Sequence, residues 1–249
     1  MITLQELSEI KEMRKTTLYY AEKEYLHYIF LHAISNYSDR NTFKGGTCLR
    51  ICYGLERASE DLDFSTLMGI KELREMVKKC LNNFDLLHIS HKATREMEFG
   101  GNIRFEVKFE GPLYSGNPSS ANTLKIDFNQ QKVKHKVANV VPKLFSDVPL
   151  FTLLALDEKE ILAEKIRALA KRKQSRDLYD IWMLLHKGVT IDKKLVLQKL
   201  KEENSSLRAV AFPSREEYQR DMKNLVRTLP PYEQVIKDIS DLLFRLEKE

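Results

Sequence analysis

Two runs of sequence decide the fold: Phe43-Lys44-Gly45-Gly46-Thr47 and, shortly after it, Asp61-Leu62-Asp63-Phe64. A Gly-Gly-Thr turn after a short extended run lets the backbone come close to a phosphate and point its N–H groups at it. The two carboxylates alternate with apolar residues, as on a strand that turns one face to the core, and their Cα atoms would be about 6.5 Å apart. Two carboxylates at this spacing can hold Mg²⁺, so the two runs predict a phosphate and metal site.

A third carboxylate, Asp127, lies in the alternating run 124–129, which places it on the polar face of another strand. Three carboxylates on strands suit a two-metal site for phosphoryl or nucleotidyl transfer. Asp61 and Asp63 would hold the ions that orient a nucleoside triphosphate. Asp127 would complete the second ion's site and help to deprotonate the acceptor hydroxyl. An Asp-x-Asp pair alone is a weak signal, and the glycine turn and the third carboxylate strengthen it.

The chain changes character near residue 150, from alternating strands and helices to helices alone. Residues 4–36 have helical spacing, Gly54 marks the end of a helix, and Gly100-Gly101 indicates a hairpin. The expected strands are 42–44, 61–65, 88–99, 103–109 and 124–129, and the expected helices include 47–53, 70–83, 192–203, 214–228 and 232–247. Apolar stripes in 161–169 and 178–185 predict two more helices. The sequence therefore indicates a mixed first part and a helical second part.

Composition places the chain among ordinary globular proteins. Its 249 residues, 43% of them hydrophobic, suffice for one large domain or two smaller ones. The three cysteines, Cys48, Cys52 and Cys80, form neither a disulfide framework nor a metal motif, which favours a reducing compartment. No apolar run approaches the ~20 residues that span a bilayer, and the first residues do not have the pattern of a signal peptide. We therefore expect a cytoplasmic protein without a membrane partner.

Positive charge is concentrated in one window. The formal net charge is +5, and residues 159–176 alone contain seven basic and two acidic residues. A basic segment favours a polyanionic partner, because phosphates that it neutralises release their counter-ions. A solvated helix face would have the same composition, so the charge alone leaves both interpretations open.

Four motifs resemble one family, the AbiEii/MenT-type nucleotidyltransferase toxins of the DNA-polymerase-β-like nucleotidyltransferase superfamily. They occur in the family's order and are Lys44-Gly45-Gly46-Thr47, Ser59-Glu60-Asp61-Leu62-Asp63-Phe64, Ala163-Glu164-Lys165-Ile166-Arg167-Ala168 and Arg176-Asp177-Leu178-Tyr179-Asp180. The resemblance implies an α+β fold: a nucleotidyltransferase core with a mixed β-sheet and flanking helices, followed by a C-terminal helical bundle domain. The expected domains are 1–38, helices that pack on the core; 39–150, the core; and 151–249, the helical domain. The active site would lie in the cleft between the last two.

The resemblance also assigns site residues. The family's metal pair falls on Asp61 and Asp63, and Asp127 matches more loosely. Lys165 would contact the triphosphate and offset the charge of the leaving pyrophosphate. The remaining nucleotide-binding positions would be Gly45, Gly46, Thr47, Arg57, Asp177 and Asp180, with Thr47 supplying the hydroxyl that a Gly-Ser turn has in many relatives. Without the resemblance, Lys165 would be interpreted as an exposed lysine and Asp177 as a charge in the first turn of a helix.

The expected activity is enzymatic. The chain would move a nucleoside monophosphate from a nucleoside triphosphate to an acceptor, with two Mg²⁺ ions as cofactors and pyrophosphate as the product. RNA is the expected acceptor, since related toxins modify RNA and the tRNA 3′ end is one known kind of acceptor among them, and a cognate antitoxin is a possible partner. Transfer to a small molecule or a protein, and a non-catalytic binding module of the same fold, are the alternatives.

Overall fold

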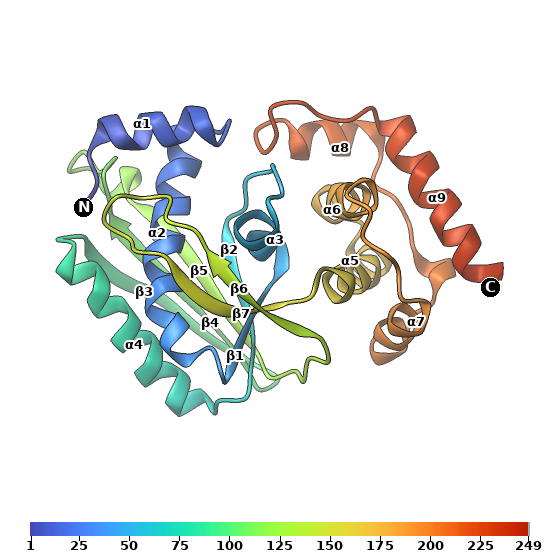
Figure 1. Ribbon diagram of the computed structural model, residues 1–249, viewed down its shortest axis with the longest axis horizontal. Helices are drawn as coiled ribbons and strands as arrows, with labels where there is room; N and C mark the ends of the chain where they lie inside the picture. Colours follow the sequence, from blue (N-terminus) through green and yellow to red (C-terminus); the bar gives the residue numbers. More distant parts are fainter. Residues whose placement is uncertain (249) are drawn as a thin grey trace. The chain divides into compact units, whose positions relative to one another are not determined.

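The computed structural model describes residues 1–248. The chain divides into two compact units, Met1–Leu156 and Asp157–Glu249, and Figure 1 labels the helices and strands of both. The first unit contains a sheet with helices, and the second contains helices. This arrangement confirms the predicted α+β class.

A seven-stranded sheet forms the centre of the first unit. Its order is β3-β4-β5-β2-β1-β7-β6, with β2 parallel to β5, β1 parallel to β7 and the other neighbours antiparallel, so the sheet is mixed as predicted. The strands are β1 (Asn41–Lys44), β2 (Asp61–Thr66), β3 (Ser90–Phe99), β4 (Asn102–Glu110), β5 (Asn122–Asn129), β6 (Lys136–Val141) and β7 (Phe151–Leu156).

Four α-helices accompany this sheet: α1 (Leu4–Met13), α2 (Leu18–Ile34), α3 (Gly45–Tyr53) and α4 (Ile70–Leu86). The predicted helical segment 4–36 is two helices, because the hydroxyls of Thr3 and Thr17 each accept a hydrogen bond from a backbone N–H and cap a separate helix. Helix α2 contacts α4 and β5, and Figure 1 shows it beside the sheet. Leu26 and Phe30 on α2 have no exposed surface, so this helix belongs to the core.

Aromatic packing fixes the register of the central strands. The ring of Phe64 on β2 stacks on that of Phe128 on β5, with centroids 5.1 Å apart, and lies 5.3 Å from the ring of Phe43 on β1. Successive side chains on a strand point to opposite faces. Asp63 precedes Phe64 and Asp127 precedes Phe128, so both aspartates are held on the opposite face of the sheet from these rings.

Strands β6 and β7 were not predicted. The sequence interpretation ended the strands before Pro149, yet β7 pairs parallel with β1 at Phe43 and Ala155, and β6 pairs antiparallel with β7. Most residues of β6 are exposed, so its sequence has no apolar face that would indicate a strand. The sequence of β7 is a short apolar run, a pattern that also fits a connecting segment. Only their pairing with distant strands identifies them, and the first unit extends to Leu156 as a result.

The second unit consists of α5 (Glu158–Arg172), α6 (Ser175–His186), α7 (Lys193–Glu202), α8 (Arg215–Met222) and α9 (Tyr232–Lys248). Helix α5 contacts α6 and α7, and α6 contacts α8 and α9. Its core contains the predicted stripes, including Leu162, Leu169 and Leu178, which have no exposed surface. Helix α8 ends at Met222, earlier than predicted. In residues 1–248, no helix combines the length and the apolar character needed to cross a membrane.

Candidate active site

Asp61 and Asp63 lie on one face of β2, as the alternation predicts. Leu62, which lies between the two aspartates, and Phe64, which follows them, are at most 1% exposed, whereas both aspartates are half-buried. The buried pair faces the core, and the carboxylates face the other side of the sheet.

Asp127 lies beside this pair on the neighbouring strand. In the parallel pairing of β2 and β5, Asp63 is opposite Asp127 and Asp61 is opposite Lys125. The Asp127 residue is only 4% exposed. The sheet thus brings the three predicted carboxylates to one region, although Asp63 and Asp127 are 64 positions apart in the sequence.

Arg104 is a member of this region that the sequence did not reveal. It lies opposite Asp127 in the antiparallel pairing of β4 and β5, and its Nε donates a hydrogen bond of 2.7 Å to Asp127 Oδ1. A single arginine in the run 103–109 carries no signal of its own. Its role becomes visible only once β4 is known to lie next to β5.

The glycine turn lies against the second carboxylate. Gly45 begins α3 with φ +80°, a conformation that favours glycine, and a Cβ added there would overlap the Asp63 carboxylate. Lys44, the N-cap residue of α3, makes no side-chain capping hydrogen bond. The start of a helix has a partial positive charge that favours anions. This turn therefore suits both an acidic side chain and a phosphate.

Thr47 and Arg57 support the turn from inside the protein. Thr47 has no exposed surface, and its Oγ1 lies 2.5 Å from the Asp61 carbonyl oxygen and 2.8 Å from Ser59 Oγ. Arg57 is 2% exposed and donates from Nη1 to the Ala58 carbonyl at 2.9 Å, and a Cβ added at Gly46 would overlap its guanidinium. Both were predicted to contact nucleotide, and in this structure they link α3 to the segment that leads into β2.

The donor set fits a hard divalent cation. Carboxylate oxygens are the ligands that Mg²⁺ prefers, and Asp61, Asp63 and Asp127 supply them from adjacent strands. Within residues 1–248, no group of three or more His, Cys, Asp or Glu side chains is close enough to form a ready metal site. The chemistry and the register therefore fit Mg²⁺, while the carboxylates are not yet gathered around one point.

Substituting alanine for Gly45 tests whether the turn positions the Asp63 carboxylate. We expect Gly45→Ala to weaken the affinity for Mn²⁺, a probe for Mg²⁺, by about tenfold, as changes to groups behind metal ligands do. Gly54→Ala is a matched control, because Gly54 also has positive φ, +73°, but no atom within 4 Å of an added Cβ. Both variants should lose about 1–2 kcal/mol of stability from the backbone conformation. Equal Mn²⁺ affinities in the two variants, measured by calorimetry, would contradict this role.

The other predicted site residues form a buried ionic cluster in the second unit. Lys165 Nζ on α5 is 2.9 Å from Asp177 Oδ1 and 2.7 Å from Asp180 Oδ2, both on α6. Arg172 Nε lies 2.7 Å from the other oxygen of Asp177. Lys165 is 8% exposed, and the two aspartates have no exposed surface. The structure therefore brings Lys165, Asp177 and Asp180 together, as the resemblance implied, but as partners of one another.

Asp177 is ionised in this cluster. Burial by itself would raise the pKa of its carboxyl, but the charges and hydrogen bonds of Lys165 and Arg172 outweigh burial and hold the pKa well below its usual range. A carboxylate held in this way keeps a negative charge at neutral pH and requires its cationic partners.

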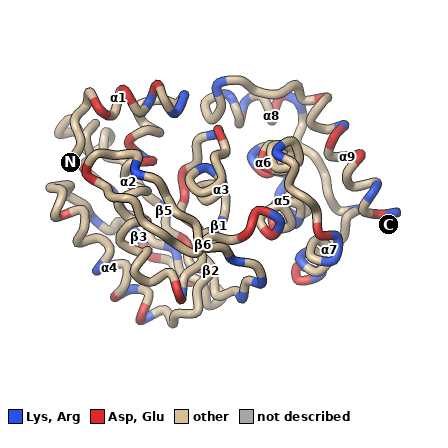
Figure 2. Tube along the Cα trace, in the orientation of Figure 1, with Lys and Arg blue, Asp and Glu red and all other residues tan. Residues whose placement is uncertain are grey.

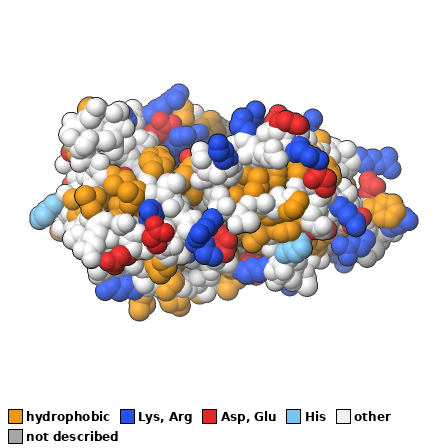
Figure 3. Space-filling view, turned by 90° about the horizontal axis from the view of Figure 1, so that it is seen from above, with side chains coloured by type: hydrophobic (Ala, Val, Ile, Leu, Met, Phe, Trp, Pro, Cys, Tyr) orange, Lys and Arg blue, Asp and Glu red, His pale blue; other side chains and the backbone are white. Residues whose placement is uncertain are grey.

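At least three of the seven basic residues of the window form ion pairs. Lys165 and Arg172 belong to the buried cluster, and Lys171 Nζ lies 2.7 Å from Glu203 Oε2. Figure 2 shows red acidic residues at the start of α5 beside the blue basic ones, and on the face drawn in Figure 3 the two signs are interspersed. Part of the window's positive charge is therefore neutralised within the second unit, and the window is a weaker polyanion site than its composition suggests.

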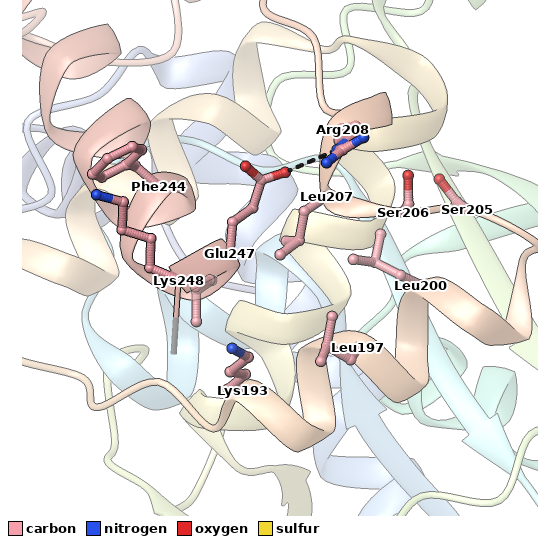
Figure 4. A pocket seen from close by; sticks show the side chains of 11 residues that line it. Lys193, Leu197, Leu200, Ser205, Ser206, Leu207, Arg208, Phe244, Glu247 and Lys248 are labelled. Carbon is pink, nitrogen blue, oxygen red and sulfur yellow. Dashed lines mark ion pairs between the residues drawn. The ribbon is translucent and has the colours of Figure 1, made fainter.

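A cavity of about 570 Å³ lies in the second unit, apart from the ionic cluster. Leu197 and Leu200 of α7 and Leu207 line it, and Arg208 and Glu247 form an ion pair of 3.6 Å at its edge (Figure 4). None of the predicted site residues lines it. It is separate from the groups that carry the predicted chemistry.

Comparisons with known proteins agree with this fold and these motifs. Residues 29–244 match the family model described as nucleotidyl transferase AbiEii toxin, type IV TA system. MenT4, a nucleotidyltransferase toxin from Mycobacterium tuberculosis H37Rv, has a similar structure, with a TM-score of 0.70, 18% identity, and coverage of 98% of this chain and 90% of that one. JHP933 from Helicobacter pylori is similar with a TM-score of 0.63, 20% identity and 94% coverage of both chains. No curated protein has a significantly similar sequence.

The two structural likenesses concern the fold, since both relatives are less than 25% identical to this chain. The family model is the stronger finding, because it extends over most of the chain and confirms both the resemblance carried by the four motifs and the expected nucleotidyltransferase class. The chain belongs to the AbiEii family of nucleotidyltransferase toxins of type IV toxin–antitoxin systems.

Proposed function

We propose that this chain transfers a nucleoside monophosphate from a nucleoside triphosphate to an RNA acceptor in the cytoplasm, with Mg²⁺ as cofactor and pyrophosphate as the second product. The 3′ end of tRNA is the acceptor that we regard as most favoured. A cognate antitoxin would counteract the modification. One observation carries the proposal: the pairing of β2 with β5 sets Asp63 opposite Asp127, with Asp61 two residues earlier on the same face.

The residues of the first unit have distinct roles in this reaction. Asp61, Asp63 and Asp127 would hold Mg²⁺, which when bound neutralises negative charge on the triphosphate and the leaving pyrophosphate. The backbone N–H groups at the start of α3, beside Gly45 and Gly46, would bind phosphate oxygens. Asp127, the most buried of the three carboxylates, would accept the proton of the attacking hydroxyl.

Lys165 differs from the residues of the first unit in that it is part of a buried ionic cluster. Its ammonium is already paired with Asp177 and Asp180, so contact with a triphosphate would require it to exchange one of these partners. A triphosphate has enough negative charge to compete for it. Lys165, Asp177 and Asp180 therefore stay in the proposal as nucleotide-binding residues, with the pair exchange as part of binding.

A second segment of the first unit supports RNA as the acceptor. Residues 130–136, the connection from β5 to β6 together with the first residue of β6, contain Lys132, Lys134 and Lys136 and no acidic residue, and these three lysines are exposed. The segment follows the strand of Asp127 and is tied back to β1, because Lys44 Nζ donates to Gln131 Oε1 at 3.2 Å. We define it as the basic loop. It offers a polyanion three positive charges in the unit that holds the carboxylates.

The test of the function is transfer of label. The protein is incubated with Mg²⁺, total RNA and each nucleoside triphosphate labelled at the α-phosphate, and the products are separated by size. Label in RNA, in an amount that depends on Mg²⁺, is the expected result. Label only in small molecules or only in protein would redirect the proposal to those acceptors, and no transfer to any acceptor would contradict it.

Removing the charges of the basic loop should weaken RNA binding. We expect the triple variant Lys132→Gln/Lys134→Gln/Lys136→Gln to flatten the slope of log affinity against log salt by about two, since each lost contact to single-stranded phosphate removes ~0.7. The affinity for nucleoside triphosphate should stay unchanged. Fluorescence anisotropy with a labelled tRNA between 50 and 200 mM salt measures the slope, a range over which such losses are large.

A matched variant controls for net charge. Lys71, Lys78 and Lys79 are exposed residues of α4 in the same unit, so replacing all three with glutamine removes the same charge elsewhere. This variant should retain most of the salt slope. If it flattens the slope as much as the loop variant does, RNA binding follows overall charge and the basic loop has no special role.

A further inference from the structure

We propose that Arg104 is the built-in counter-ion of the candidate metal site: it neutralises Asp127 in the metal-free protein and competes with the divalent cation for that carboxylate. This inference rests on the proposed function, because it assumes that the carboxylates bind a metal ion. It makes Arg104 a positioning residue, which acts through Asp127 and not on the reacting atoms.

The geometry of β4 and β5 supports this role. Arg104 and Asp127 are direct partners in the antiparallel pairing, so their side chains leave the sheet on the same face. The hydrogen bond from Nε to Oδ1 is 2.7 Å long, within the range of charge-assisted bonds. The side chain of Asp127 is 6% exposed, and that of Arg104 is 35% exposed. The carboxylate is thus buried, while the guanidinium keeps access to solvent.

Arg104 also responds to the other two carboxylates. The negative charges of Asp61 and Asp63, as well as that of Asp127, act on the Arg104 guanidinium and favour its positive form. The guanidinium therefore pairs directly with Asp127 and is also attracted by the other two carboxylates. The absence of a ready three-ligand metal group in residues 1–248 agrees with an Asp127 that is oriented toward Arg104.

Two demands on Asp127 explain why such a counter-ion is useful. A buried carboxylate without a partner is costly, so the metal-free protein needs a cation beside it. A permanent partner would block the metal site, but a half-exposed arginine can move into solvent when a divalent ion takes its place. Because the two cations compete for one carboxylate, loss of Arg104 should strengthen metal binding and weaken the metal-free fold.

The experiment compares Arg104→Gln with Arg74→Gln. Arg74 is a matched control, since it forms ion pairs with Glu96 at 2.7 Å and with Glu98 on β3 in the same unit. Calorimetric titration with Mn²⁺ in the absence of nucleotide gives the affinity, and thermal unfolding with EDTA or with Mn²⁺ gives the stability of each state. We expect Arg104→Gln to bind Mn²⁺ about tenfold more tightly than the unaltered protein, a typical coupling between two ligands of one site.

The melting temperatures should change in the corresponding sense. With EDTA, Arg104→Gln should melt below the unaltered protein, and added Mn²⁺ should raise its melting temperature by a larger amount. Arg74→Gln should show the Mn²⁺ affinity and the Mn²⁺ stabilisation of the unaltered protein. Arg104→Lys keeps a cation at this position and should have an intermediate Mn²⁺ affinity, which also provides a folded variant if Arg104→Gln is too unstable.

The outcomes separate this inference from the proposed function. Equal Mn²⁺ affinities for the unaltered protein, Arg104→Gln and Arg104→Lys would show that Arg104 is only structural, and the metal-dependent function would stand. Mn²⁺ binding by none of them would overturn both. Tighter binding by Arg104→Gln but not by Arg74→Gln, with a lower melting temperature of Arg104→Gln in EDTA, supports the counter-ion role.

Discussion

Replacing Asp63 with asparagine is expected to lower the rate of nucleotidyl transfer by about a thousandfold, because a lost metal ligand removes several kcal/mol of transition-state stabilisation and ~1.4 kcal/mol corresponds to tenfold in rate. Both the strand register and the glycine turn place Asp63 in the candidate site, since it lies opposite Asp127 on the neighbouring strand and against Gly45 of the glycine turn. Its neighbours on the strand, Leu62 and Phe64, hold it in place by core packing and are unaffected by the change. The loss should therefore be chemical.

Stability measurements separate this chemical effect from unfolding. Asparagine has nearly the same shape as aspartate and removes one negative charge from a region with three, so the free energy of unfolding of Asp63→Asn should change by no more than ~0.5 kcal/mol. Asp39→Asn, at an exposed position of the same unit, is the control and should keep full activity. If Asp63→Asn transfers label to RNA at the rate of this control, the carboxylates of β2 are not the catalytic centre.

The sequence predicted the position on the sheet of those candidate site residues that follow a local pattern. Asp61, Asp63 and Asp127 sit on alternating strands, and alternation specifies which face a side chain takes before the strand's neighbours are known. Arg104 also sits on an alternating strand, but its meaning depends on β4 being adjacent to β5, which is a property of sheet order. The same reason explains why β6 and β7 were missed. Patterns within a segment and the hairpin of β3 and β4 could be predicted from the sequence, whereas pairings between strands far apart in the chain could not.

The second unit shows the same division between local and distant information. The spacing of Asp177 and Asp180 predicts that they share a helix face, and they do, because both contact Lys165. The burial of all three could not be foreseen, because it depends on how α5 packs on α6. Thr47 is a parallel case in the first unit: the hydroxyl that was predicted to lie at the phosphate donates a hydrogen bond to the Asp61 carbonyl oxygen, a contact that depends on how α3 packs against β2.

Replacing Lys165 with methionine is expected to destabilise the second unit by roughly 3–5 kcal/mol, the usual cost of leaving a buried charge without its partner. Lys165 forms ion pairs of 2.9 Å with Asp177 and 2.7 Å with Asp180, and its loss removes a buried cation from beside both carboxylates. Urea unfolding followed by tryptophan fluorescence measures the effect, because the chain's one tryptophan, Trp182, is on α6 in the same unit. Lost activity in a Lys165 variant would thus be ambiguous without this measurement.

A charge-balanced double variant resolves the ambiguity. Lys165→Met/Asp180→Leu removes one charge of each sign and leaves the Arg172–Asp177 pair, so it should recover most of the lost stability, as apolar replacements of buried ion pairs do. If the Lys165–Asp180 pair also takes part in binding triphosphate, the double variant should fold and yet bind nucleotide weakly. A stable Lys165→Met single variant would instead show that Asp180 is satisfied without the lysine, and the cluster would then owe its stability to other contacts.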